Sequence, residues 1–320
     1  MVHLELSRPM RVLVEEISNV RSDDDVVILT DDTRYPMAKA LASAARAVDA
    51  TTGILSLPME TRGGVELPKM AGAVMKSADY VFIMTSNNVT HTDAHRDAQA
   101  AGTQIASMWG ANEDLFINGP SPENYQAVDD MVSSVKETLQ GVSEIRITTD
   151  SGTDLRFSVE ERPVIALGIK VNDKSDGAAD FPQGEVAIAP VEGTATGRIR
   201  IDAAMDNIGL VNTPIDLTFE DGYLTKIEGG EEANQLRRMV EDSDDNAGNL
   251  AEFAIGTNEG ARLVDNMRET KKKYGTIHIA IGDSNTIGGK VKSDLHLDGV
   301  VLDPTVFADG EKIMDSGELL

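Results

Sequence analysis

A histidine and an aspartate two residues apart, His296-Leu297-Asp298, could act together on one metal ion. If the segment is a β-strand, the imidazole and the carboxylate point to the same face of the sheet, because side chains alternate along a strand. Such a pair could supply two ligands to an ion. A structural histidine with satisfied hydrogen bonds would explain the same spacing, so the pair needs support from elsewhere in the chain.

Three further segments share a pattern in which a metal-competent side chain has only small residues beside it on its own strand face. They are residues 185–189 (EVAIA), 252–256 (EFAIG) and 278–282 (HIAIG). A half-exposed strand would ordinarily fill its polar face with larger polar residues. A solvent face that happens to carry small residues is the alternative. We favour a site in which Glu185, Glu252 and His278 stand among small neighbours that leave room for an ion, its water and a substrate.

Glu185, Glu252, His278, His296 and Asp298 would together form an oxygen- and nitrogen-rich site. Such a site suits Zn²⁺, Co²⁺, Mn²⁺ or Fe²⁺. Five ligands exceed what one catalytic ion with an open position needs, so the set indicates two ions bridged by a carboxylate. Either glutamate could bridge the ions or act as the general base.

The segments around these residues resemble the metal-binding motifs of the aminopeptidase T/aminopeptidase S metallopeptidase family. They are residues 181–186 (FPQGEV), 249–258 (NLAEFAIGTN), 278–282 (HIAIG) and 296–298 (HLD). Residue by residue, the family's glutamates fall on Glu185 and Glu252, and its histidines and aspartate on His278, His296 and Asp298. The resemblance implies an N-terminal α/β domain, a C-terminal domain with a two-metal site, and removal of N-terminal residues from peptides.

Two features of the sequence differ from that family. The family places a tyrosine soon after the histidine that corresponds to His278, where residues 283–285 are DSN, and the interval between His278 and His296 is shorter here. The fold is also similar to that of 2,5-dihydroxypyridine 5,6-dioxygenase, a ring-cleaving enzyme with one non-haem Fe(II), whose HxD pair maps onto His296 and Asp298. This second resemblance implies a set of two histidines and one carboxylate, as expected for such oxygenases.

His91 and His95 lie where a predicted strand ends and a helix begins. Crevices at the carboxyl ends of parallel strands commonly bind ligands. His91 could therefore act as a substrate contact or proton carrier, and Glu185, Glu252 and His91 are the predicted catalytic residues. A helix-capping segment with surface histidines is the alternative.

The elements that must position these residues fall into two halves, residues 1–145 and 146–320. In the first half, short apolar runs predict strands at residues 26–30, 53–57, 80–85 and 103–108, and helical patterns fall at residues 36–48, 68–77 and 92–101. Strands and helices that alternate with such short connections predict βαβ units and a parallel sheet. The first half is therefore expected to be an α/β domain.

The second half is expected to be a β-rich α+β domain that carries the metal site. Strands are predicted at residues 144–149, 154–159, 185–189, 197–203, 215–219 and 224–228, with hairpin turns at residues 150–152 and 221–222. Helices are predicted at residues 233–240 and 259–270. The second helix ends in three lysines, residues 271–273, whose charges suit a helix C-terminus.

Composition narrows the classes of partner. The 320 residues include no cysteine, which excludes disulfides, thiolate ligands and a cysteine nucleophile. The 29 basic and 54 acidic residues give a formal charge of −25, which disfavours nucleic acid and anionic lipid as partners.

No apolar run of about 18 residues occurs, so no membrane span is expected and the cytoplasm is the expected location. We interpret the evenly spread acids as an adaptation to a high-salt cytoplasm, where the Debye length is about 3 Å near 1 M salt.

The sequence thus predicts, in order of preference, three functions. The first is a metal-dependent aminopeptidase that acts on small peptides, the second an Fe(II) ring-cleaving dioxygenase, and the third a non-catalytic metal-binding scaffold. Related enzymes form homo-oligomers, so a homo-oligomer is also expected.

Overall fold

The computed structural model describes residues 4–58, 65–90, 92–170 and 180–320. The chain forms two compact units. Unit 1 consists of Met1–Asp129 and Gly168–Gln183, and unit 2 of Asp130–Leu167 and Gly184–Leu320. The chain therefore passes between the units more than once, where the sequence suggested a single boundary near residue 145.

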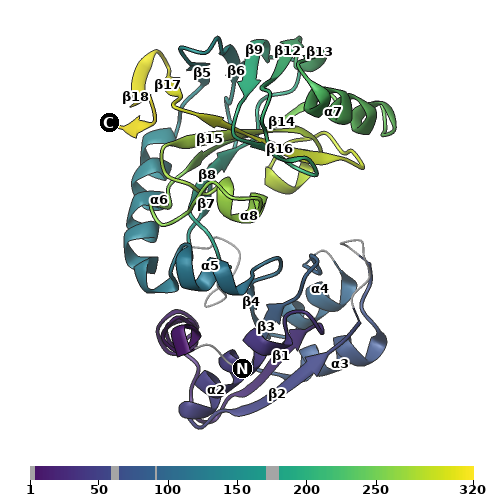
Figure 1. The fold of residues 1–320 in the computed structure, drawn as a ribbon, viewed down its shortest axis with the longest axis vertical. Helices are drawn as coiled ribbons and strands as arrows, with labels where there is room; N and C mark the ends of the chain where they lie inside the picture. Colours follow the sequence, from purple (N-terminus) through teal and green to yellow (C-terminus); the bar gives the residue numbers. More distant parts are fainter. Residues whose placement is uncertain (1–3, 59–64, 91, 171–179) are drawn as a thin grey trace. The chain divides into compact units, whose positions relative to one another are not determined.

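Unit 1 contains a four-stranded parallel sheet in the order β2-β1-β3-β4 (Figure 1). Its strands are β1 (Asp25–Thr30), β2 (Thr51–Ser56), β3 (Tyr80–Met84) and β4 (Gln104–Ser107). The connecting helices are α2 (Tyr35–Ala47), α3 (Lys69–Ser77) and α4 (Asp93–Ala100). Helix α2 packs against β1 and β2, and α3 packs against α4. The predicted parallel α/β domain is confirmed.

Further helices lie where the sequence analysis predicts none. They are η1 (Leu4–Leu6), α1 (Ser7–Arg11), the π-helix η2 (Val12–Ile17), α5 (Glu113–Asn118), η3 (Pro122–Asn124) and α6 (Tyr125–Leu139). Helix α6 begins in unit 1 and continues into unit 2. Among the described residues, no helix combines the length and the apolar character needed to cross a membrane.

Unit 2 contains two antiparallel sheets, which confirms the predicted β-rich domain. One sheet has the order β13-β12-β9-β6-β5-β17-β18-β19 and the other β11-β10-β16-β15-β14-β8-β7. The eight-stranded sheet consists of β5 (Glu144–Thr148), β6 (Asp154–Ser158), β9 (Thr196–Ile201), β12 (Ile215–Glu220), β13 (Tyr223–Glu228), β17 (Thr305–Ala308), β18 (Glu311–Asp315) and β19 (Glu318–Leu319). The seven-stranded sheet consists of β7 (Ile165–Leu167), β8 (Glu185–Ile188), β10 (Ala204–Met205), β11 (Gly209–Leu210), β14 (Leu250–Gly256), β15 (Thr276–Gly282) and β16 (His296–Leu302).

The two sheets of unit 2 pack against each other through apolar side chains. Phe157 of β6 and Phe253 of β14 are both buried, and their ring centroids lie 5.7 Å apart. Ile201 of β9 lies so close to Gly299 of β16 that a Cβ on this glycine would come within 2.8 Å of it. Because side chains alternate along β14, Glu252 points to the face of the seven-stranded sheet that is turned away from the eight-stranded sheet.

The predicted helix over residues 259–270 is wrong for most of its length. Only α8 (Met267–Thr270) and the 3-10 turn η4 (Asn285–Ile287) are helical in this part of unit 2. Buried Glu269 accepts hydrogen bonds from the backbone N–H, Nε and Nη2 of Arg262, at 3.0, 2.7 and 3.1 Å. The hydroxyl of Thr270 donates to the carbonyl oxygen of Val264 at 2.7 Å. These contacts fold the preceding residues back onto α8 as a loop.

The other helix predicted in the second half is present as α7 (Glu231–Glu241), which packs against β12 and β13 (Figure 1). Both predicted hairpin turns are also present, between β5 and β6 and between β12 and β13. Asp221 and Gly222 have φ angles of 48° and 82°. Two consecutive positive φ angles match the twist of a two-residue hairpin, which explains the Asp-Gly sequence.

Candidate metal centre

Neighbouring strands of the seven-stranded sheet bring the predicted ligands together. Glu252 of β14 lies opposite Ala280 of β15, and Ala280 lies opposite Asp298 of β16. The two carboxylates therefore share one row across the sheet, with a methyl group between them. His278 lies two residues before Ala280, and His296 lies opposite Gly282, so both imidazoles belong to the same face of the sheet.

The imidazole of His278 is surrounded by carboxylates. Its Nε2 lies 3.3 Å from Oε1 of Glu252, 3.6 Å from Oε2 of Glu185 and 4.0 Å from Oδ1 of Asp298. His278 and the three acids are buried. Nε2 of His296 lies 3.3 Å from Oε2 of Glu252 and 3.5 Å from Oδ1 of Asp298. All five predicted ligands thus meet at one place on the sheet.

The five residues form two groups that share one glutamate. The inner group is Glu185, Glu252 and His278, and the outer group is Glu252, His296 and Asp298. Within each group the candidate ligand atoms lie within 4.8 Å of one another. An ion with bonds of about 2.1 Å holds neighbouring ligand atoms about 3.0–3.5 Å apart, which is close to the nitrogen–oxygen distances observed. Each group of acids and histidines could therefore hold a divalent metal ion.

Buried atoms without hydrogen-bond partners support metal binding at these groups. Oε2 of Glu185, Oδ1 of Asp298 and Nδ1 of His278 are buried and have no such partner. A buried polar group left unsatisfied costs about 1–3 kcal/mol, and more when it is charged. A cation among these side chains would supply the missing interaction of both carboxylate oxygens, so the residues fit a divalent ion.

The ring of His296 is held in an orientation that suits a metal ligand. Its Nδ1 lies 2.7 Å from the backbone carbonyl oxygen of Asp283. Because a carbonyl oxygen only accepts, Nδ1 carries the proton and donates it, which leaves Nε2 of the neutral ring free to bind a metal. Burial opposes the charged ring, but the carboxylates of Asp298 and Glu252 outweigh this effect and raise the pKa of His296 above its ordinary value. The side chain remains 31% exposed, so the outer group is reachable from solvent.

Two lysines that the sequence analysis assigned to a helix C-terminus lie in the site. Nζ of Lys272 forms an ion pair with Oε1 of Glu185, and Nζ of Lys271 lies 2.5 Å from Oδ2 of Asp298. The side chain of Lys272 is only 5% exposed, and that of Lys271 is 20% exposed. Both follow α8 directly, so the loop contacts of Arg262 and Glu269 determine where they lie.

Burial and charge act in opposite directions on these ion pairs. Burial would raise the pKa of Glu185, but the ammonium groups of Lys272 and Lys271 outweigh it and hold this pKa below its ordinary value. The same holds for Asp298, whose pKa is well below its usual range because of Lys271 and the two imidazoles. Burial lowers the pKa of Lys272 to about 8, against the opposing effect of Glu185. At neutral pH the carboxylates of Glu185 and Asp298 are therefore negatively charged, and the ammonium groups of Lys271 and Lys272 are positively charged.

The glycines of the small-residue pattern make room for the protein's own backbone. A Cβ on Gly256 would lie 2.2 Å from the carbonyl oxygen of Lys273, and one on Gly282 would lie 2.0 Å from the carbonyl oxygen of Leu295. The expectation that these two positions leave space for an ion and substrate is therefore wrong. Their physical role is to admit the segments that carry Lys272 and His296.

A family model described as 2,5-dihydroxypyridine 5,6-dioxygenase (NicX) matches residues 11–320. The chain belongs to this family. A comparison with curated proteins finds no significant match.

Two solved structures share the fold of this family member. The 2,5-dihydroxypyridine dioxygenase from Pseudomonas putida KT2440 aligns with a TM-score of 0.78 and 18% identity, over 98% of this chain and 96% of that one. Wild-type AmpT from Thermus thermophilus aligns with a TM-score of 0.71 and 15% identity, over 99% of both chains. At these identities the likenesses show the fold alone. Both families to which the sequence was likened are thus represented among proteins of this fold.

A fourth acid, which sequence reasoning missed, lies next to the outer group in this family member. Oδ2 of Asp206, which follows β10, accepts a hydrogen bond from the backbone N–H of Asp298 at 3.1 Å. Burial, reinforced by the charge of Asp298, raises the pKa of Asp206 to about 6. Asp206 is 92 residues from Asp298 in the chain, and no local pattern marks it.

A hollow of about 630 Å³ adjoins His296 and gives the outer group an opening within unit 2. Its lining combines apolar side chains with acids, among them Met239, Leu297, Asp242 and Asp294. A small molecule could occupy this space beside the imidazole. Residues 242–244, which follow α7, thus border the site.

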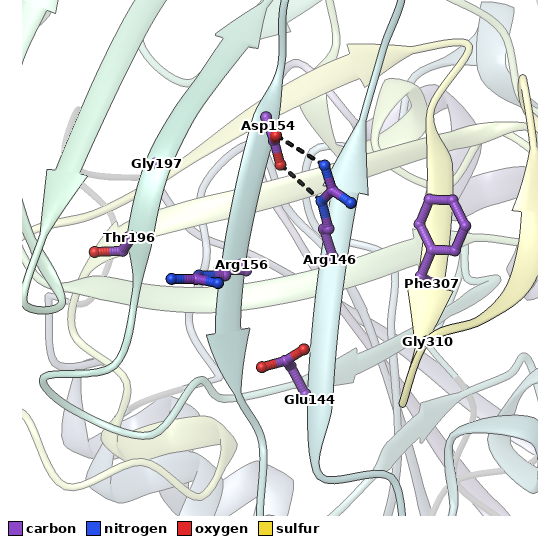
Figure 2. Close-up of a pocket in the computed structure, with 8 residues that line it drawn as sticks. All are labelled: Glu144, Arg146, Asp154, Arg156, Thr196, Gly197, Phe307 and Gly310. Atoms are coloured by element: carbon purple, nitrogen blue, oxygen red, sulfur yellow. Dashed lines mark hydrogen bonds and ion pairs between the residues drawn. The ribbon is translucent and has the colours of Figure 1, made fainter.

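A second hollow, of about 670 Å³, lies on the eight-stranded sheet (Figure 2). There the guanidinium of Arg146 makes a bidentate ion pair with Asp154, at 2.8 and 2.9 Å, next to Arg156 and Phe307. Arg146, Asp154 and Arg156 lie on the solvent face of β5 and β6, whereas Ile145 and Phe157 lie on the buried face. The hollow is therefore separated from the metal centre by the packed sheets.

The predicted catalytic histidine His91 lies outside the described residues, so its role stays a prediction. His95 of α4 is buried. Its backbone N–H donates to the hydroxyl of Thr92, which caps the helix. The predicted helix cap is thus present at Thr92, whereas the surface position expected for His95 is wrong.

Proposed function

We propose that this chain is a dioxygenase that uses one non-haem Fe(II) ion and molecular oxygen to cleave the ring of a small hydroxylated aromatic compound. Membership of the 2,5-dihydroxypyridine 5,6-dioxygenase family supports this reaction and substrate class. A dihydroxypyridine is accordingly the first substrate to test.

One observation at the site carries the proposal. Oδ1 of Asp298 is buried, lacks a hydrogen-bond partner, and lies 4.0 Å from Nε2 of His278 and 3.5 Å from Nε2 of His296. Two imidazoles and one carboxylate are the ligands by which many oxygenases hold Fe(II) while leaving positions open. Glu252 lies 3.3 Å from both imidazoles and adds negative charge beside the ion.

The chain's own residues prepare this position. A bound ferrous ion would supply redox chemistry with oxygen and would polarise a hydroxyl group of the substrate. The carbonyl of Asp283 fixes the ring of His296, and Lys271 holds Oδ2 of Asp298, which leaves Oδ1 facing the imidazoles. The positive charge of Lys271 would also favour an ionised hydroxyl group on a substrate bound nearby.

A metal-dependent aminopeptidase, the first prediction from the sequence, remains a second candidate. The observation that favours it is the position of Glu252, which belongs to both the inner and the outer group. A shared carboxylate is what a two-metal hydrolase needs to bridge its ions. The fold of AmpT is compatible with this alternative.

Metal loading under anaerobic conditions would test the two candidates side by side. We would remove metals with a chelator, reload the protein with Fe(II) or with Zn²⁺, Co²⁺ or Mn²⁺, and assay each form twice. One assay measures oxygen uptake with 2,5-dihydroxypyridine, and the other measures release of p-nitroaniline from an amino-acid p-nitroanilide. Asp298→Ala should abolish activity, and the exposed Glu220→Gln should not change it.

We expect oxygen uptake only with Fe(II) and the dihydroxypyridine. Amide hydrolysis by the Zn²⁺, Co²⁺ or Mn²⁺ form, without oxygen uptake by the Fe(II) form, would overturn the dioxygenase proposal and support the aminopeptidase. Activity in neither assay, with metal bound, would count against both enzymes on these substrates.

A further inference from the structure

The inner and outer groups differ in the cation that already contacts them. In the inner group, the ammonium of Lys272 pairs with Glu185, and both side chains are almost fully buried, at 5% and 3% exposure. In the outer group, Lys271 pairs with Asp298 but is 20% exposed, and His296 is 31% exposed. The inner group is thus the one with a buried resident cation.

Backbone contacts hold Lys272 in place. The backbone N–H of Asn258 donates to the carbonyl oxygen of Lys272 at 2.8 Å, and Asn258 accepts from the N–H of Tyr274 at 3.0 Å. Gly256 lies against the carbonyl carbon of Lys272, where a Cβ would come within 3.0 Å of it. The lysine therefore cannot withdraw from Glu185 by a shift of its own backbone without breaking these contacts.

A divalent ion in the inner group would face an unfavourable charge arrangement. It would lie beside the ammonium of Lys272 in a buried region, where like charges repel strongly because the effective dielectric constant is low. In the outer group, by contrast, Lys271 contacts Oδ2 of Asp298 while Oδ1 has no hydrogen-bond partner. An ion could bind Oδ1 there without displacing the lysine.

The formal charge of the whole cluster is also balanced by a single divalent ion. Four carboxylates surround the site, from Glu185, Glu252, Asp298 and Asp206, and two ammonium groups face them, from Lys271 and Lys272. With the histidines neutral as ligands, the formal charge is −2, which a single divalent ion neutralises. A second divalent ion would leave the buried cluster at +2.

We propose that the ammonium of Lys272 takes the place of a second metal ion on Glu185, so that the cluster binds one divalent ion, held by His296 and Asp298 of the outer group together with His278. This inference deepens the proposed function, because a mononuclear centre is what the Fe(II) chemistry requires. Lys272 is then a positioning residue that determines how many ions the site accepts.

Metal stoichiometry tests the inference without any assay of catalysis. Metal-free protein would be titrated with Mn²⁺ at pH 7, bound metal would be counted by equilibrium dialysis and elemental analysis, and the electron paramagnetic resonance spectrum would report isolated or coupled Mn²⁺. We expect one Mn²⁺ per chain and an isolated signal for the unchanged protein. Lys272→Met should bind two, with a coupled signal, and the control Lys226→Met, which changes an exposed lysine outside the site, should bind one.

Two ions in the unchanged protein, or one ion in a folded Lys272→Met variant, would overturn the inference. Should Lys272→Met not fold, the double variant Glu185→Gln/Lys272→Met removes both partners of the buried pair together, which is generally tolerated better than removing one. The double variant should bind one Mn²⁺ with a Kd within about threefold of the unchanged protein. A Kd weakened tenfold or more would show that Glu185 is a ligand and would refute the proposal.

The inference about metal stoichiometry and the proposed function can be refuted independently of each other. One bound Mn²⁺ together with peptidase activity would leave the inference standing and remove the proposed function. Two bound ions together with oxygen uptake would do the reverse.

Discussion

The carbonyl oxygen of Lys273 lies so close to Gly256 that a Cβ on the glycine would come within 2.2 Å of it. This contact joins the end of β14 to the segment that delivers Lys272 and Lys271 to the acids. Lys271 and Lys272 can therefore occupy their positions in the site only because residue 256 is a glycine.

Gly256→Ala should consequently destabilise unit 2 and disturb the lysines. Because the obstructing atoms are backbone, the segment must shift, and we expect a loss of about 1–3 kcal/mol in the free energy of unfolding, measured by urea denaturation. Gly248→Ala is a matched control, since its Cβ would meet only ordinary contacts at 3.4 Å or more from Leu224. Equal stability of the two variants would contradict this explanation of Gly256.

Divalent metal should stabilise the folded protein. Binding to the folded state alone contributes about 2.7 kcal/mol when the free metal is at 100 times its Kd, so adding Mn²⁺ should raise the Tm in calorimetry. Asp298→Asn should remove most of this increase, because it neutralises the carboxylate whose Oδ1 has no other partner. In Glu220→Gln, which changes an exposed acid, the increase should persist; its loss there would point to non-specific binding.

Asp216 should give stability that depends on pH. Its carboxylate accepts a bidentate pair of hydrogen bonds from Arg200 at 2.8 Å, and Arg198 also contacts it, which together lower the pKa of Asp216. A lowered pKa in the folded state means that the stabilisation is complete above the unfolded value near 3.8 and is lost as the pH falls through the folded value.

The variant Asp216→Asn should therefore be less stable than the unchanged protein at pH 7, by about 1 kcal/mol after allowance for solvent screening. The difference should hold down to about pH 4 and shrink below it, as measured by urea denaturation at each pH. The pair between Asp154 and Arg146 is exposed, so Asp154→Asn should change stability little. A difference for Asp216→Asn that grows in acid would have the wrong sign.

The excess of acidic residues leads to a prediction about salt. A formal charge of −25 causes self-repulsion that salt screens, since the Debye length falls from about 10 Å at 0.1 M to about 3 Å at 1 M. The Tm should rise as KCl is increased from 0.1 to 2 M. Sucrose at equal osmolality serves as the uncharged control. A protein that is equally stable in dilute buffer would not support the interpretation as an adaptation to high salt.

Local alternation in the sequence was enough to find the strands that carry the five metal-competent acids and imidazoles. A side chain and its neighbours two residues away must share a strand face, so Glu252 with Ala254, and His296 with Asp298, were placed on common faces before any tertiary contact was known. The parallel sheet of unit 1 followed in the same way from strands and helices that alternate with short connections.

Which charged groups surround the five metal-competent side chains depended on tertiary structure. Lys271 and Lys272 looked like the end of a helix, but the bond between Arg262 and Glu269 folds that segment into a loop that delivers both ammonium groups to the acids. Asp206 reaches Asp298 across 92 residues. Contacts between segments so far apart are set by how strands pair and sheets pack, and no local period in the sequence encodes them. The sequence by itself therefore determined which residues could bind metal, while the fold decided which charges surround them.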